Sequence, residues 1–276
     1  MELPPITSSQ NRQVSQVRRY LARPKECRRE GILVADGIHL VQEAIRAKLP
    51  CRALFVSTDE RDPEIAQLVV ESTRLRLPLY RALPQVFRNL SPVETPQGIV
   101  GVFARPRFDR ANFWGRDEDH GGHLAIAHGI QDPVNIGSLA RSAQAAGLRG
   151  LVTTPGTVDP YHHRALRASM GAAFHLPHLL EEPILPLLER LRNLGFITVG
   201  LTARGEKVLT DLDPHRPTAL LLGSEGSGLD PGVLQAVDCR VRIPIHPGVE
   251  SLGVAAAGAV AFFWLHLVSR NGKPAH

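Results

Sequence analysis

The chain has 276 residues, a formal net charge of +5 and 43% hydrophobic residues. This length suggests about two domains, and the ordinary globular composition excludes a collagen-like, coiled-coil or wholly disordered protein. The cysteines Cys27, Cys51 and Cys239 form no CxxC pair, which excludes a disulfide framework and favours a reducing cytoplasmic location.

The first part of the chain alternates between strand and helix patterns. Strands are predicted at 31–35, 53–57 and 98–104, and helices at 37–48 and 63–73. We expect a small α/β domain over residues 1–108. Residues 109–122 are polar, charged and glycine-containing, which predicts a linker.

The pattern restarts after the linker. Strands are predicted at 123–128, 150–153, 196–200, 219–222 and 240–243, with a helix at 136–147. Apolar strands without polar alternation indicate a parallel sheet covered on both faces, here in a domain of residues 123–276. The apolar stretch 253–268 is too short for a membrane span and predicts a buried core helix, and no secretory signal opens the chain.

The excess of positive charge lies entirely in the first part: residues 1–110 carry a net charge of +6 and residues 111–276 a net charge of −1. A basic cluster on one module suits a phosphate backbone, because each contact releases condensed counterions. The alternative, a solvated helix face, stays open. The candidate contacts to a nucleic-acid backbone in this segment are Arg18, Arg19, Arg28 and Arg29.

Three glycine-bearing loops follow strands of the second domain. The first, 131–141, places Asn135 at the start of a helix and Arg141 about one turn inside it. A guanidinium there offers a fork for phosphate or carboxylate. The alternative is that Asn135 is an N-cap and Arg141 a surface arginine. The second, 222–229, has three glycines that permit close backbone approach but lacks GxGxxG and GxxxxGK[ST]. The third, 243–254, carries Ser251, which is either a helix cap or a ligand contact. All three should meet at the carboxyl ends of the strands.

The order and content of these loops resemble the SpoU (TrmH-like) family of RNA ribose 2′-O-methyltransferases. The matching segments are Asn135, Gly137 and Arg141, then 223–229, then 243–245 with 250–252, and a further block at 166–172. The N-terminal part resembles the L30e-like substrate-binding domain of several members, including its strand at 96–101.

The resemblance implies an α/β fold with a C-terminal trefoil knot, bound S-adenosylmethionine, and a homodimer that binds RNA. It carries catalytic roles onto Arg141, Asn135, Glu225 and Ser251. It also implies that RNA contacts include Arg164 and Arg167, for which a solvated helix face is again the alternative. The implied cofactor-binding residues are Thr202, Gly223, Ser224, Glu225, Gly226, Ile243, Pro244, Ile245, Ser251 and Leu252.

The chemistry assigns a role to each catalytic candidate. Arginine is too basic to accept a proton readily, so we interpret Arg141 first as a clamp on a phosphate that orients the ribose hydroxyl, and second as the base that the family view assigns. Asn135 orients the ribose or Arg141, Glu225 pairs with an arginine, and Ser251 contacts the nucleotide. Ribosomal RNA is favoured over transfer RNA, because a basic accessory domain suits a large structured RNA.

Two departures from the family pattern keep an alternative open. Gly253 stands where the family usually has Asn, and Ser224 replaces the commoner Asn of the second motif. A non-catalytic or weakly active RNA-binding protein on the same fold is therefore the second hypothesis. A nicotinamide oxidoreductase is disfavoured because the glycine fingerprint is missing. A metal site is disfavoured because the histidines lack partners at zinc-ligand spacing.

Overall fold

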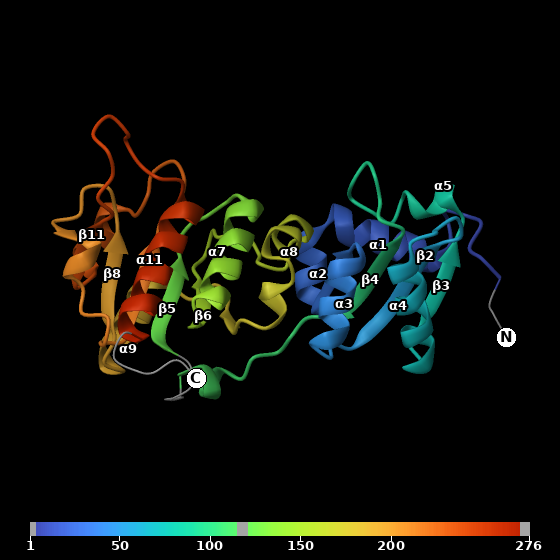
Figure 1. Cartoon of the computed structure of the whole chain (residues 1–276), viewed down its shortest axis with the longest axis horizontal. Coiled ribbons are helices and arrows are strands. Elements are labelled where there is room, and N and C mark those ends of the chain that lie inside the picture. Colours follow the sequence, from blue (N-terminus) through green and yellow to red (C-terminus); the bar gives the residue numbers. More distant parts are fainter. Residues whose placement is uncertain (1–3, 115–120, 271–276) are drawn as a thin grey trace. The chain divides into compact units, whose positions relative to one another are not determined.

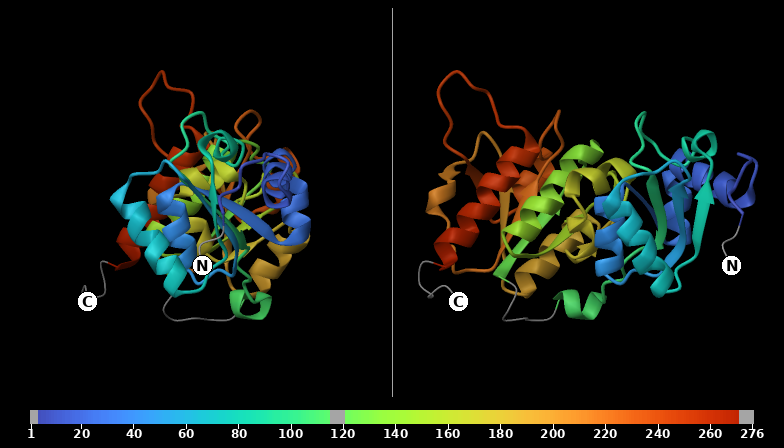
Figure 2. Two further views of the ribbon diagram at one scale, coloured as in Figure 1. Left: turned by 90° about the vertical axis from the view of Figure 1, so that its right-hand side faces the viewer. Right: turned by 45° about the vertical axis from the view of Figure 1, so that its right-hand side comes forward.

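The computed structural model describes residues 4–114 and 121–270, and residues 115–120 of the predicted linker lie outside them. The chain forms two compact units (Figures 1 and 2). The first comprises Met1–Arg107 with Tyr161–Phe174, and the second comprises Phe108–Pro160 with His175–His276. The segment Tyr161–Phe174, which we expected in the second domain, therefore clusters with the first unit.

The first unit is built on a four-stranded sheet of order β1-β4-β2-β3. Strand β4 is antiparallel to β1 and β2, and β3 is parallel to β2. The elements are α1 (Arg12–Ala22), α2 (Pro24–Glu30), β1 (Ile32–Asp36), α3 (Ile38–Arg46), β2 (Cys51–Ser57), α4 (Pro63–Arg74), β3 (Leu79–Ala82), α5 (Pro84–Phe87), β4 (Ile99–Ala104), α8 (His163–Ser169) and the 3₁₀ turn η1 (Ala172–Phe174).

Helices α1 and α2 lie in the basic segment, for which the sequence analysis kept a solvated helix face as the alternative to a phosphate-binding cluster. Val14, Val17 and Tyr20 recur at helical spacing on one side of α1 and are buried against the sheet. The arginines occupy the remaining positions and stay at the surface. The basic segment is thus an amphipathic helix pair whose apolar side completes the core of the first unit.

The second unit is built on a seven-stranded sheet of order β7-β6-β5-β10-β8-β11-β9, in which every pairing is parallel. Its elements are α6 (Arg110–Trp114), β5 (Gly121–Ala127), α7 (Pro133–Ala145), β6 (Leu148–Thr153), β7 (His178–Leu179), α9 (Ile184–Asn193), β8 (Ile197–Leu201), β9 (Lys207–Val208), η2 (Leu209–Asp211), β10 (Thr218–Leu222), α10 (Pro231–Ala236), β11 (Cys239–Arg242) and α11 (Val254–Arg270).

Helices cover both faces of this sheet, as the apolar strands predict. On one face Leu221 packs in a cluster with Leu187 of α9 and Val233 of α10. On the other face α7 and α11 pack against each other (Figure 1), and Gly258 of α11 lies close to Leu139 of α7. The sheet is therefore enclosed, and its carboxyl edge remains for a site.

Candidate functional site

Predicted cofactor-binding residues follow three neighbouring strands of the second unit. Thr202 comes directly after β8, Gly223 after β10 and Ile243 after β11. Because β10, β8 and β11 are adjacent and parallel, their carboxyl ends lie at one edge of the sheet. The structure thus brings the second and third glycine-bearing loops together where open α/β sheets bind their ligands.

The first loop is joined to the second by a hydrogen bond between two predicted catalytic residues. Asn135 Nδ2 donates to Glu225 Oε1 at 2.9 Å, and the backbone amides of Gln131 and Asp132 approach the same carboxylate at 3.5 and 3.4 Å. Partial burial acts to raise the pKa of Glu225, but these hydrogen bonds outweigh it and lower the pKa. The carboxylate is therefore held ionised by amide donors.

This arrangement differs from the arginine partner that we expected for Glu225. Within residues 4–114 and 121–270 the carboxylate forms no ion pair with an arginine. Glu225 instead fixes the position of Asn135, which lies inside the first turn of α7, while Asp132 caps that helix by accepting from Val134 N. The N-cap alternative for Asn135 is therefore wrong.

Arg141 lies on α7, six residues beyond Asn135. Six residues turn an α-helix by about 240° from its starting direction, so the two side chains leave the helix in different directions. The guanidinium is exposed, and it makes no hydrogen bond or ion pair within the part of the chain that the structure describes. Arg141 is therefore available to an external anion but is not in contact with Asn135 or Glu225.

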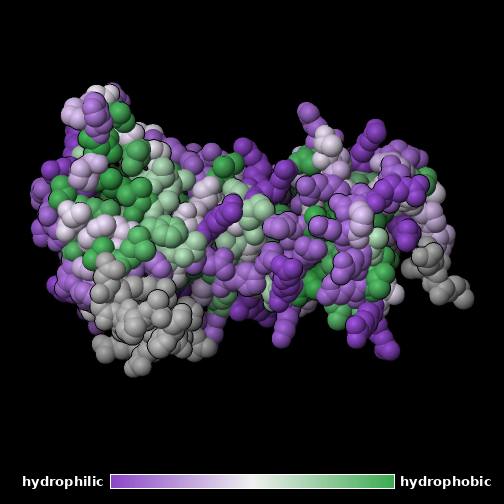
Figure 3. Space-filling model, viewed as in Figure 1, coloured by the Kyte–Doolittle hydropathy of each residue, from purple (hydrophilic) through white to green (hydrophobic). Residues whose placement is uncertain are grey.

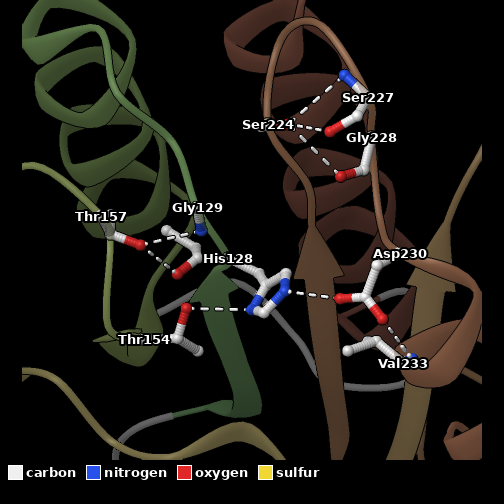
Figure 4. A network of polar contacts seen from close by, with 10 residues as sticks. His128, Gly129, Thr154, Thr157, Ser224, Ser227, Gly228, Asp230 and Val233 are labelled. Carbon is white, nitrogen blue, oxygen red and sulfur yellow. Dashed lines mark hydrogen bonds and ion pairs between the residues drawn. The ribbon is translucent and has the colours of Figure 1, made fainter.

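The second loop is a tight turn whose ends pair with each other. Ser224 N donates to Gly228 O at 3.1 Å and Gly228 N donates to Ser224 O at 2.9 Å. Gly228 has φ of +67°, in the region that favours glycine. The hydroxyls of Ser224 and Ser227 lie 2.8 Å apart across the turn (Figure 4). The turn exposes Glu225 and Gly226 at its tip.

The third loop extends from the second unit between β11 and α11 (Figure 2). Ser251 and Leu252 in it are exposed. Gly253 O accepts from Ala257 N at 2.9 Å, so Gly253 is the cap residue of α11. The capping alternative for Ser251 is therefore wrong. Its predicted contact with the nucleotide stays a prediction.

A functional candidate that the sequence analysis missed is His128, directly after β5. Its Nδ1 lies 2.9 Å from Thr154 Oγ1 and its Nε2 lies 3.0 Å from Asp230 Oδ2 (Figure 4). In the sequence it is one of twelve histidines and has no partner at metal-ligand spacing. Only the fold brings residues 26 and 102 positions away to the two ring nitrogens.

The candidate RNA contacts of the first unit differ in their availability. Arg19 forms ion pairs with Glu26 at 3.1 Å and with Glu30 at 3.0 Å, so its charge is already balanced. Arg18 and Arg29 are exposed and form no ion pair within the described residues. The four arginines therefore do not contribute equally to a surface for phosphate. On α8, Arg164 and Arg167 are also exposed.

The residues that the structure describes contain no group of three or more His, Cys, Asp or Glu side chains that could hold a metal ion. No helix among them is both long enough and apolar enough to span a bilayer.

Comparison with known proteins gives consistent matches for both parts of the chain. The SpoU rRNA Methylase family model matches residues 123–263, and the MRM3-like substrate binding domain matches residues 11–101. The chain is 31% identical over 261 residues to an uncharacterized tRNA/rRNA methyltransferase of Synechocystis sp., covering 94% of this chain and 92% of that protein.

It is also 26% identical over 260 residues to the 23S rRNA (guanosine(2553)-2'-O)-methyltransferase RlmP of Bacillus subtilis, covering 94% of this chain and 98% of that protein. The crystal structure of the SpoU methyltransferase AviRb from Streptomyces viridochromogenes, in complex with the cofactor AdoMet, matches with a TM-score of 0.83 and 25% identity over 96% of this chain and 100% of that chain. The predicted fold class is thereby confirmed. The chain belongs to the SpoU rRNA methylase family and carries an MRM3-like substrate-binding domain ahead of its methylase domain.

Proposed function

We propose that this RNA methyltransferase transfers a methyl group from S-adenosylmethionine to a ribose 2′-hydroxyl of ribosomal RNA. The observation that carries the proposal is the hydrogen bond between Asn135 and Glu225. It joins two motif loops beside the carboxyl ends of β10, β8 and β11. Arg141, which pairs with no side chain among the described residues, lies on the same helix as Asn135.

The loops suit S-adenosylmethionine because they leave main chain accessible. An added Cβ at Gly226 or Gly253 would meet no atom within 4 Å, so both positions border open space. We assign the cofactor to the backbone around Thr202, Gly223 and Ile243, with the exposed tips of the second and third loops beside them. When bound, S-adenosylmethionine supplies an electrophilic methyl group on a sulfonium.

The side chains of this chain then position the nucleophile. A hydroxyl that attacks in line gains much of its rate from correct placement, and a clamp on the neighbouring phosphate provides it. Arg141 has the planar fork that binds phosphate through two hydrogen bonds. Asn135, fixed by Glu225, orients the ribose. At the 2′-oxygen the new C–O bond would form as the methyl C–S bond of the sulfonium breaks, S-adenosylhomocysteine would be the leaving group, and the hydroxyl proton would pass to water.

The preference for ribosomal over transfer RNA is supported by the first unit. It carries the excess positive charge of the chain and matches a substrate-binding domain. Arg18, Arg29, Arg164 and Arg167 are exposed cations within this unit. Contacts of this kind to phosphates suit structured RNA, which is read largely by shape. A cytoplasmic location stays a prediction.

A homodimer is supported by the outer side of α11. Val260, Phe263 and Leu267 recur at helical spacing and are 45%, 39% and 58% exposed, and apolar side chains gather over this helix in the space-filling view (Figure 3). An apolar stripe of this kind is typical of an interaction surface. We assign it to a second copy of the chain, which light scattering would test: Phe263→Glu should shift the particle to monomer mass.

Methyl transfer from labelled S-adenosylmethionine to purified RNA tests the proposed function. We expect label in deproteinised ribosomal RNA, little label in transfer RNA at equal nucleotide concentration, and none with Arg141→Ala. Preferential labelling of transfer RNA would reject the proposed substrate. Absence of label from every RNA fraction, with the cofactor bound, would reject the proposed activity.

A further inference from the structure

His128 holds both ends of the second motif loop, and no motif of the family resemblance includes it. Its backbone N–H donates to Leu222 O at 2.8 Å, at the last residue of β10 before the loop. Its Nε2 lies 3.0 Å from Asp230 Oδ2, at the first residue after the buried Leu229. One residue directly after the neighbouring strand β5 therefore bonds to the chain immediately before and after 223–229.

The Asp230 carboxylate determines which ring nitrogen of His128 carries a hydrogen. A carboxylate only accepts hydrogen bonds, so Nε2 carries the hydrogen and donates. In the neutral ring Nδ1 then accepts from the hydroxyl of Thr154, 2.9 Å away. The His128 side chain is 20% exposed and the Asp230 side chain is 55% exposed, so the bond is partly shielded from water.

The two carboxylate oxygens of Asp230 contact different partners. Oδ1 accepts from Val233 N at 3.0 Å and caps α10, while Oδ2 faces His128. Helix α10 packs in the core of the second unit through Val233. The far end of the loop is thus anchored to a helix and to a strand end at once (Figure 4).

The residues on either side of His128 are held by Thr157, which lies in the loop after β6. Gly129 N donates to Thr157 Oγ1 at 3.0 Å, and Thr157 Oγ1 donates to Ala127 O at 3.0 Å. Residue 128 therefore sits at the base of both loops that Asn135 and Glu225 join at their tips. A change in its side chain should alter the second loop without removing any group of the reaction.

We propose that His128 is a positioning residue that, through Asp230, holds the 223–229 loop in the conformation that binds S-adenosylmethionine. The inference rests on the proposed function for the location of the cofactor. It predicts a loss of cofactor affinity, with little change in the rate once the cofactor is saturating, because His128 touches no reacting atom.

The test compares His128→Ala with His128→Gln and His128→Asn, using titration calorimetry with S-adenosylmethionine. A glutamine amide reaches the position of Nε2 and can donate to Asp230, whereas an asparagine amide reaches only the position of Nδ1. We expect Kd to rise about tenfold in His128→Ala and His128→Asn, a loss of about 1.4 kcal/mol, and to stay within about threefold of the wild type in His128→Gln. Thermal unfolding of each variant separates loss of the fold from loss of the contact.

A double-mutant cycle identifies the partner. Asp230→Ser keeps a residue that caps helices well but is too short to reach His128. If the bond carries the effect, the double variant His128→Ala/Asp230→Ser should bind no more weakly than either single variant. Additive losses, an unchanged Kd in His128→Ala, or failure of His128→Gln to restore binding in a fully folded protein would overturn the inference.

The outcomes also separate this inference from the proposed function. Variants that lose affinity as predicted, in a wild type that methylates no RNA, would reject the proposed function and keep the role of His128. A wild type that methylates RNA, with affinity indifferent to residue 128, would reject the inference alone.

Discussion

Gly223→Ala should open the second motif loop, because the backbone of the same loop occupies the space that a side chain needs. An added Cβ would lie 2.1 Å from Gly228 C and 2.3 Å from both Gly228 O and Leu229 N. These are backbone atoms, so no rotamer change relieves the contact. Overpacking of this kind costs about 1–3 kcal/mol, which corresponds to a loss of roughly 5- to 150-fold in affinity if the bound loop must be closed.

The assay is calorimetric titration of S-adenosylmethionine into Gly223→Ala, with Gly122→Ala as the matched control. Gly122 lies at the start of β5, and its nearest contact for an added Cβ is 3.4 Å, an ordinary distance. The control should bind as the wild type does. Wild-type affinity in Gly223→Ala would refute the assignment of the cofactor to this loop.

Four further predictions concern the catalytic arginine, the departure from the family pattern, the basic surface and a buried carboxyl. Arg141→Ala should abolish methyl transfer while the Kd for S-adenosylmethionine and the unfolding temperature stay near wild type, because the exposed guanidinium bonds to nothing in the described chain; an equal loss of affinity and rate would contradict its role. Gly253→Asn should have the stability of the wild type or exceed it by a few tenths of a kcal/mol, since the space around this cap position is open. A lower unfolding temperature would count against this. A rise in methylation would show that the reaction lacked the side-chain amide. Arg18→Gln/Arg29→Gln should make the dependence of log K on log salt shallower by about 2, and an unchanged slope would remove both from the RNA surface. Burial raises the pKa of Asp36, so the folded state loses stability as pH rises from below the pKa of this carboxyl in the unfolded chain toward its pKa in the folded chain. Asp36→Asn should therefore have a higher unfolding temperature than the wild type at pH 7, and the difference should shrink below about pH 4. Lower stability of the variant at both pH values would disprove this.

The sequence located most strands because a short run of apolar residues directly indicates a buried strand. The apolar runs at 219–222 and 240–243 correspond to β10 and β11 within a residue or two. The parallel sheet followed from strands that lack polar alternation. The basic segment was given a helix face only as an alternative and without bounds, because its many arginines conceal a narrow apolar side, which in α1 consists of Val14, Val17 and Tyr20.

Membership of the two units could not be derived from order along the chain. Helix α8 lies between β6 and β7 in the sequence, yet it packs on β1 within the first unit. The family match over residues 123–263 includes this helix. Position in the sequence assigns it to the methylase domain, whereas its contacts with β1 belong to the other unit, and Gly171, just after the helix, lies close to Glu43 of α3. The domain boundaries drawn from the sequence stay a prediction.

The candidate site was predictable in its composition but not in its pairing. The family resemblance identified Asn135 and Glu225 as site residues, but their hydrogen bond joins residues 90 positions apart. Charge complementarity predicted an arginine partner for Glu225, whereas in the structure its partners are amide N–H groups. His128 carried no signal, because a single histidine after a strand is usually a packing residue.

The position of the transferred methyl group tests the central claim most directly. Alkaline cleavage of RNA requires a free 2′-hydroxyl, so a 2′-O-methyl group protects the adjoining phosphodiester bond. After reaction with labelled S-adenosylmethionine and exhaustive alkaline hydrolysis of ribosomal RNA, the account predicts that the label is recovered in an alkali-resistant dinucleotide and is absent with Arg141→Ala. Label recovered in mononucleotides would place the methyl group on a base and contradict the account.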